Sequence, residues 1–136
     1  IDMKIEPFLI SSSVMAILAQ RLVRVLCKEC RESYQITPAE IAELELKTGA
    51  SGATVYRAKG CEVCFNTGYL GRSAIYELLT VDDEIRQLIM KNTDASTIKA
   101  MAMARGMRTL RQDGAAKVLQ GVTSVDEVVR VTQKEA

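Results

Sequence analysis

The four cysteines of the chain constrain its fold more than any other feature. They form two Cys-x-x-Cys pairs with 30 residues between them, at Cys27, Cys30, Cys61 and Cys64. A Cys-x-x-Cys turn places two sulfur atoms on the same side of a tight loop, and two such turns complete the tetrahedron of ligands that Zn²⁺ prefers. The sequence therefore predicts one zinc ion bound by all four cysteines.

The same pairs allow other interpretations. Four unrelated core cysteines rarely fall into two such pairs, and a thioredoxin-like redox centre needs one pair that opens a helix after a strand, a context that neither pair has. An iron ion with the same four ligands is a further alternative. Because the chain has no histidine, a zinc site here is all-cysteine, and all-cysteine sites without an open position are structural.

Motifs for catalysis are missing from the sequence. No G-x-x-x-x-G-K-[ST] phosphate-binding loop occurs, and Gly71-Arg72-Ser73 lacks its lysine. No serine lies in a nucleophile elbow. Asp82 and Asp83 are adjacent carboxylates, but they precede an expected helix, where acidic residues act as caps and dipole partners. We therefore assign no catalytic residue.

Periodicity and capping residues predict helices and strands in the first half of the chain. Apolar residues at a spacing near 3.6 predict an amphipathic helix over 7–26, and a loop over 27–36 carries the first cysteine pair. Thr37-Pro38-Ala39-Glu40 combines a cap, an N1 proline and a capping-box glutamate, so it predicts a helix that ends near residue 48. Alternation predicts a strand over 54–58.

The second half is expected to begin with one strand and continue as short helices. The strand is predicted over Ser73–Leu79. Helices are predicted over about 83–91, 97–105, 107–120 and from 125 onward, with N-caps at Asp82, Ser96 and either Thr123 or Ser124. We expect these helices to form a small bundle.

Composition argues against two classes of partner. A zinc-ribbon module that binds nucleic acid is an alternative function for a chain with four paired cysteines. Such a module needs a clustered basic surface. The net charge of this chain is +1, aromatic residues make up 4% and tryptophan is absent. No apolar run approaches the roughly 20 residues of a spanning helix. The first residues show no secretion signal, so we expect a cytosolic chain, and the abrupt start suggests a fragment of a longer protein.

Three basic residues follow helical spacing near the first cysteine pair. Arg21, Arg24 and Lys28 would form a basic strip on the predicted helix over 7–26. Such a strip is typical of a solvated helix face, and the alternative is contact with an anionic ligand or an acidic partner.

Several motifs, in order along nearly the whole chain, resemble the C-terminal region of the GspE/PilB family of secretion ATPases. The motifs are Ala19-Gln20-Arg21-Leu22-Val23-Arg24, Gly60-Cys61-x-x-Cys64, Gly68-Tyr69-x-Gly71-Arg72, Ile75-Tyr76-Glu77-Leu78-Leu79, Thr109-Leu110-x-x-Asp113-Gly114 and Gly121-x-Thr123-Ser124. Type II secretion and type IV pilus members both fit this pattern.

The resemblance implies a fragment of a cytoplasmic, hexameric RecA-like motor at the cytoplasmic face of the inner membrane. In the family the tetracysteine element binds zinc, and its ligands match Cys27, Cys30, Cys61 and Cys64. ATP and Mg²⁺ would bind only in upstream parts, so the fragment alone is not expected to hydrolyse ATP. The implied partner is an inner-membrane platform protein or a cytoplasmic adaptor, without nucleic acid. Arg21, Arg24 and Arg72 are candidates for partner or core contacts.

We therefore predict an α+β fragment in three parts. Residues 1–26 form a helical tail of the ATPase core, residues 27–66 form a zinc-binding tetracysteine lobe with short strands, and residues 67–136 return through a strand into a C-terminal helical bundle. The metal would hold together a lobe that is too small to be stable alone.

Overall fold

The computed structural model describes residues 16–46 and 50–133, and these residues form an α+β fold as predicted. The chain groups into two compact units: a smaller one over 1–19 and 77–109, and a larger one over 20–76 and 110–136. Neither unit coincides with one of the three predicted parts, and the three-part division stays a prediction. No helix within the described ranges has the length and apolar character to cross a bilayer.

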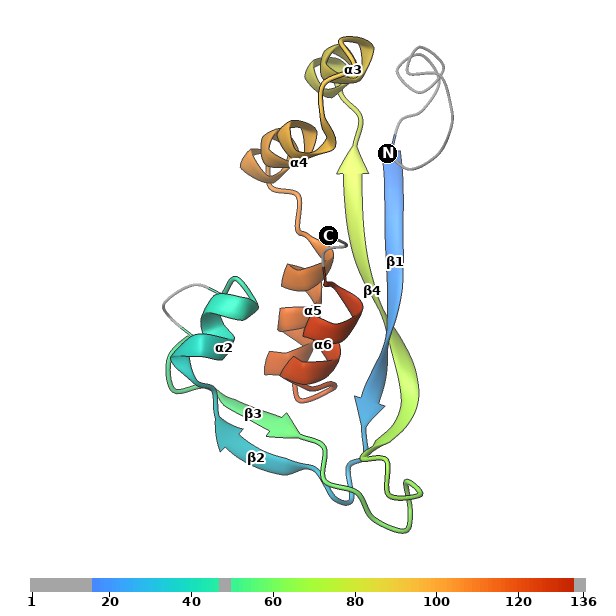
Figure 1. The fold of residues 1–136 in the computed structure, drawn as a ribbon, viewed down its shortest axis with the longest axis vertical. Helices are drawn as coiled ribbons and strands as arrows, with labels where there is room; N and C mark the ends of the chain where they lie inside the picture. Colours follow the sequence, from blue (N-terminus) through green and yellow to red (C-terminus); the bar gives the residue numbers. More distant parts are fainter. Residues whose placement is uncertain (1–15, 47–49, 134–136) are drawn as a thin grey trace. The chain divides into compact units, whose positions relative to one another are not determined.

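The first described element is a strand, so the predicted helix over 7–26 is wrong for its described part. Strand β1 spans Ala16–Leu26 and pairs with β4, Tyr69–Thr80, and the two arrows run in opposite directions (Figure 1). The apolar residues of β1 suit either period in isolation. Pairing with β4, more than 40 residues further along the chain, decides for the strand, since the ladder satisfies the backbone groups of both segments. The part over 7–15 lies outside the described residues.

A two-stranded antiparallel sheet follows the first cysteine pair, with one helix between its strands in the sequence. Strand β2, Glu32–Gln35, pairs antiparallel with β3, Thr54–Arg57, with Ser33 opposite Tyr56. The loop prediction over 27–36 missed β2, whereas the strand prediction over 54–58 is confirmed. Helix α2, Pro38–Glu43, has the predicted capping box. It ends earlier than predicted, because Leu44 leaves the helical conformation and Glu45 takes a positive φ of 57°.

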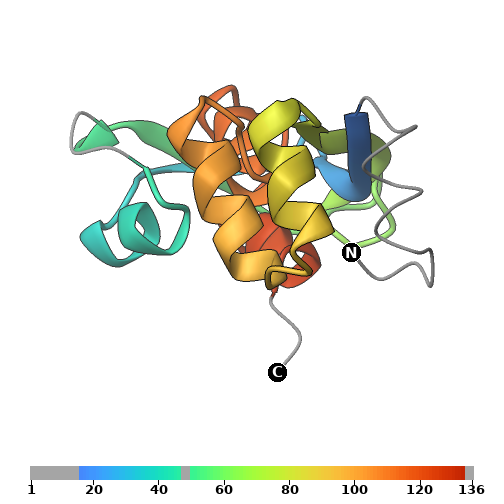
Figure 2. The same ribbon diagram turned by 90° about the horizontal axis from the view of Figure 1, so that it is seen from above.

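Two helices belong to the smaller unit, where they lie side by side (Figure 2). Helix α3 spans Asp83–Met90 and is capped by Asp82 as predicted, whereas α4 spans Ala95–Ala104. The predicted cap Ser96 is wrong: Asp94 accepts a hydrogen bond from the Thr97 N–H at 2.8 Å and begins the helix earlier. Their core consists of Val81, Ile85, Ile89, Ile98 and Ala102.

Two further helices belong to the larger unit. Helix α5 spans Leu110–Leu119, and α6 spans Val125–Val131 with Ser124 as its N-cap, one of the two predicted caps. Gly114 allows their close approach, because a Cβ there would lie 2.6 Å from a methyl group of Val128. The core of this unit is formed by Val23, Ile36, Leu44, Val55, Ile75, Ala115, Val118, Val125 and Val128. It therefore joins α5 and α6 to β1, β3 and β4, to Ile36 directly after β2 and to the end of α2.

Candidate metal centre

The two sheets of the structure place the four cysteines. Cys27 and Cys30 lie in the turn between β1 and β2, and Cys61 and Cys64 lie between β3 and β4. Because β1 pairs with β4 and β2 pairs with β3, both turns lie where the chain passes from one sheet to the other. The pairing of strands therefore brings together cysteines that are far apart in the sequence.

The sulfur atoms have the spacing of a metal site. The Sγ–Sγ distances are 3.8 Å for Cys27–Cys61, 3.8 Å for Cys30–Cys64 and 3.7 Å for Cys61–Cys64, and all four atoms lie within 4.8 Å of one another. A tetrahedron with metal–sulfur bonds of about 2.3 Å has sulfur–sulfur edges of about 3.8 Å. All four thiols are free, so the arrangement fits four ligands around one ion.

Backbone N–H groups surround the sulfur atoms. Gly60 donates to Cys30 Sγ at 3.3 Å, and Gly68 donates to Cys64 Sγ at 3.1 Å. Burial raises the pKa of Cys64, but hydrogen bonds from the backbone of Cys61 and Gly68 outweigh it and lower the pKa to about 6. This environment favours a thiolate at Cys64, the form of cysteine that binds a metal.

A proton is retained more strongly at Cys61. A backbone hydrogen bond with Cys64 lowers the pKa of Cys61, whereas burial and hydrogen bonds with the other three thiols raise it, with a net result of about 11. Sulfur atoms this close cannot all carry a negative charge without a cation between them. Metal binding would therefore release the remaining thiol protons.

Two glycines permit the tight path of the second cysteine turn. A Cβ at Gly68 would lie 2.5 Å from the Ala58 Cβ, and one at Gly60 would lie 3.0 Å from the Asn66 carbonyl oxygen. Both glycines also have positive φ angles. Hydrogen bonds from Asn66 N to Cys61 O at 2.8 Å and from Thr67 Oγ1 to Cys64 O at 2.7 Å close the turn. The backbone is thus folded closely around the sulfur atoms.

Arg31 connects the first cysteine turn to the loop between α5 and α6. Its guanidinium donates to the Gly121 carbonyl oxygen at 2.7 Å and stacks on the Tyr56 ring at 4.1 Å from the centroid. The backbone adds Leu26 N to Val122 O at 2.8 Å. These contacts join the cysteine turn to the loop between α5 and α6.

Arg24 makes an internal contact. Its backbone N–H and its guanidinium donate to the Glu127 carboxylate at 2.8 to 3.2 Å, and Arg130 donates to the same group at 2.9 and 3.0 Å. The Glu127 side chain is fully buried. Burial raises its pKa, but the hydrogen bonds from Arg130 and Arg24 outweigh it and lower the pKa to about 2. Glu127 is therefore a buried carboxylate with two arginine partners.

The predicted basic strip of Arg21, Arg24 and Lys28 is wrong, because neighbouring side chains of a strand point to opposite faces. Arg21 and Arg24 are three residues apart in β1, so they do not share a face. Arg21 and Arg72 are exposed. The sequence analysis did not predict the burial of Glu127, since an acidic residue in the first turn of a helix is usually an exposed dipole partner.

Comparison with known proteins identifies relatives over almost the full chain. The sequence pattern of the family described as Type II/IV secretion system protein matches residues 1–130. Type II secretion system protein E of Pseudomonas aeruginosa is 48% identical over 99% of the chain. Type IV pilus assembly ATPase PilB of Thermus thermophilus is 46% identical over 96%, and type II secretion system ATPase E of Vibrio cholerae is 44% identical over 98%.

The chain spans a minor share of each relative. It covers 26% of the Pseudomonas protein, 15% of the Thermus protein and 26% of the Vibrio protein.

Proposed function

The chain belongs to the type II/IV secretion system protein family, and from this premise we propose that it is the C-terminal region of a secretion motor ATPase that powers protein export or pseudopilus assembly. In this proposal the region contributes a structural zinc site and a docking surface. ATP and Mg²⁺ bind in the remaining parts of a hexameric motor at the cytoplasmic face of the inner membrane.

The sulfur geometry is the observation that carries the proposed zinc site. Four free cysteines supply a complete all-sulfur ligand set at tetrahedral spacing. Zn²⁺ supplies no redox chemistry in such a site and acts as a crosslink. The chain's own residues position the ligands, since the N–H groups of Gly60 and Gly68 orient two of the sulfur atoms.

Metal binding would provide folding free energy to a lobe with few apolar contacts. Residues 27–36 and 54–68 contribute only Cys27, Ile36, Val55 and Cys64 as buried hydrophobic side chains. A structural zinc ion contributes an apparent free energy of about 10–16 kcal/mol to small zinc-binding units. Ile36 and Val55 belong to the apolar core of the larger unit, so the crosslink would add stability mainly to the two cysteine turns, which bury few apolar side chains of their own.

Elemental mass spectrometry of the chain purified without added metal tests this site. We expect close to one zinc per chain, released when the thiols are modified. A Cys61→Ser, Cys64→Ser variant is the matched control and should contain none. Iron in place of zinc, or equal metal content in the control, would contradict the proposed site.

A lobe made rigid by metal is suited to docking, and we assign this docking to the inner-membrane platform protein or a cytoplasmic adaptor. The test is binding between the chain and the purified cytoplasmic domain of the platform protein, with zinc and after chelation. Binding that is lost when zinc is removed by chelation, and that returns when zinc is added back, supports the proposal. Equal binding in both states, or none in either, contradicts it.

Assembly of a type IV pilus is the second candidate. The pilus ATPase of Thermus thermophilus, at 46% identity, resembles the chain nearly as closely as the type II protein of Pseudomonas aeruginosa, at 48%. Exchange of the matching region into each of these two relatives would discriminate, since the correct host should retain its secretion or piliation and the other should lose it.

A further inference from the structure

The loop between α5 and α6, residues 120–124, meets the chain on both sides of the first cysteine turn. Before the turn, Leu26 N donates to the Val122 carbonyl oxygen at 2.8 Å. After the turn, the Arg31 guanidinium donates to the Gly121 carbonyl oxygen at 2.7 Å. The loop therefore holds both ends of the first cysteine turn in place.

The same loop is connected to the strands around the second cysteine turn. Tyr56 lies in β3, the strand that leads toward Cys61, and the Arg31 guanidinium stacks on its ring at 4.1 Å from the centroid. Tyr69 begins β4 after the second turn, and its hydroxyl oxygen lies 2.6 Å from that of Ser124. Residues that flank both cysteine turns thus converge on one loop.

Gly121 is the point at which Arg31 and Tyr56 reach the loop. A Cβ at Gly121 would lie 3.1 Å from Arg31 Nη1 and 3.1 Å from a ring carbon of Tyr56. Both distances are shorter than an ordinary van der Waals contact, so an alanine there would push the guanidinium or the ring away. The loop, the ring and the guanidinium are therefore packed closely together, and Arg31 directly follows Cys30 in the sequence.

We propose that Arg31 is a positioning residue for the metal ligands and that it couples metal binding to the loop between α5 and α6. The inference deepens the proposed function and rests on its zinc site. Arg31 is not a ligand. It holds the first cysteine turn against β3, so that the sulfur atoms of the two turns face each other before an ion binds. A preorganised site loses less conformational freedom on binding than a mobile one.

Coupling between two sites is reciprocal. If an ordered loop improves metal binding through Arg31, then a bound ion stabilises the ordered loop by the same factor. The guanidinium is half-buried and its hydrogen bond to Gly121 is charge-assisted, a strong type of hydrogen bond. The zinc-bound chain should therefore have a better protected loop, and a better protected start of α6, than the zinc-free chain.

The zinc affinity of the chain, measured by competition with a chromophoric chelator, tests the positioning role. Arg31→Met keeps a long side chain but removes the hydrogen bond and the stacked guanidinium, and it should weaken zinc binding about tenfold. Arg31→Lys keeps a donor for the Gly121 carbonyl oxygen but loses the planar stacking. Its affinity should therefore lie between those of wild type and Arg31→Met. Equal affinity in wild type and Arg31→Met would overturn the inference.

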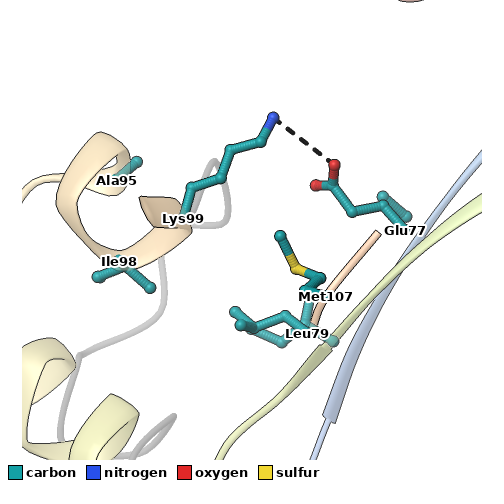
Figure 3. Close-up of a pocket in the computed structure, with 8 residues that line it drawn as sticks. Glu77, Leu79, Ala95, Ile98, Lys99 and Met107 are labelled. Atoms are coloured by element: carbon teal, nitrogen blue, oxygen red, sulfur yellow. Dashed lines mark ion pairs between the residues drawn. The ribbon is translucent and has the colours of Figure 1, made fainter. Parts of the chain in front are cut away.

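A basic side chain of the smaller unit provides a control for the lost charge. Figure 3 shows Lys99 of α4 paired with Glu77 beside an apolar pocket, at an Nζ–Oε1 distance of 3.6 Å. The smaller unit contains none of the cysteines, so Lys99→Met removes one positive charge away from both cysteine turns. It should change the zinc affinity by about twofold or less. An equal loss in Lys99→Met and Arg31→Met would mean that net charge sets the affinity, and would overturn the inference.

Two glycines with the same backbone conformation separate contact from strain. Gly121 has a φ of +80° and Gly52 has a φ of +81°, but a Cβ at Gly52 would have no atom within 4 Å. Gly121→Ala should weaken zinc binding more in wild type than in Arg31→Met, because the flexible methionine yields to the added methyl group. Gly52→Ala should have the same effect in both backgrounds. If Gly121→Ala also has the same effect in both, Arg31 and the loop act independently and the inference is wrong.

Amide exchange measures the coupling at the loop itself. In wild type, saturation with zinc should raise the protection of residues 120–128. In Arg31→Met at saturating zinc, this increase should be roughly half as large or less, although both chains then carry the metal. A loss of stability alone would not produce this result. A rise of equal size in both chains, or no rise in wild type, would contradict the coupling.

The same measurements distinguish failure of this inference from failure of the zinc site. Wild type that binds no zinc would contradict the proposed zinc site and the role of Arg31 together. Zinc that is bound with the same affinity by wild type and Arg31→Met would contradict the role of Arg31 alone.

Discussion

The two compact units of the molecule are stabilised in different ways. In the larger unit, polar groups and sulfur atoms far apart in the sequence meet: the four cysteines, and Glu127 with Arg24 at a separation of 103 residues. In the smaller unit, α3 and α4 are neighbours in the sequence and pack through a small apolar core, with side-chain caps at both helix starts. The larger unit thus adds long-range polar and sulfur contacts to an apolar core that its strands share with α5 and α6, whereas local interactions between consecutive helices predominate in the smaller unit.

The largest expected effect comes from removal of one sulfur ligand. Cys61→Ser should abolish metal binding and remove amide exchange protection from residues 27–36 and 54–68, because the crosslink contributes more free energy than any other interaction there. Helices α3 and α4 should keep their protection. Hydrogen exchange with mass spectrometry measures both regions in one sample. A variant whose cysteine turns remain protected would contradict a structural role of the metal.

The next effect concerns the buried carboxylate of the larger unit. Glu127→Gln removes the charge that both Arg24 and Arg130 contact, and it should lower the free energy of unfolding by about 3 kcal/mol. Denaturant unfolding monitored by exchange in α6 measures this change. Asp83→Asn is the matched control: Asp83 also pairs with an arginine, but its side chain is 96% exposed, so we expect less than about 0.5 kcal/mol. Equal effects at both positions would refute a special role for burial.

Acid should weaken the larger unit through the same carboxylate. The pKa of Glu127 is lowered to about 2 from 4.5, so its contribution is present above pH 4.5 and is lost as the pH falls from 4.5 to 2. The difference corresponds to about 3 kcal/mol at most. Unfolding measured over this pH range should show a steeper decline for wild type than for Glu127→Gln. Parallel declines would mean that other carboxylates cause the acid sensitivity.

The smallest effect is expected in the smaller unit. Asp82 accepts a hydrogen bond from the Ile85 N–H at 3.0 Å and pairs with Arg105. Asp82→Ala should cost about 1 kcal/mol, since the cap contributes most and the partly exposed ion pair adds little. Exchange protection of α3 should decline while the cysteine turns remain unchanged. A loss of protection in the cysteine turns would show that the two units do not respond separately.

Prediction from the sequence succeeded where the signal is local. The capping box at Thr37 and Glu40 and the cap at Asp82 depend on residues within one turn of each other, and both occur as predicted. It failed at β1, because the apolar residues of this segment fit a helix as well as a strand and the partner strand lies far along the chain. Strand β2 was missed for a similar reason, since its four residues carry a weak pattern by themselves.

The candidate site likewise has features that the sequence specifies and features that only the packing of distant segments specifies. Four cysteines in two close pairs determined by themselves that a metal site was the leading interpretation, because the spacing within each pair sets the direction of two sulfur atoms. Only the tertiary structure decided that Glu127 is buried between two arginines and that Phe65 projects outward from the second turn. Burial and exposure depend on which distant segments pack together, and a residue's type and near neighbours do not specify those segments.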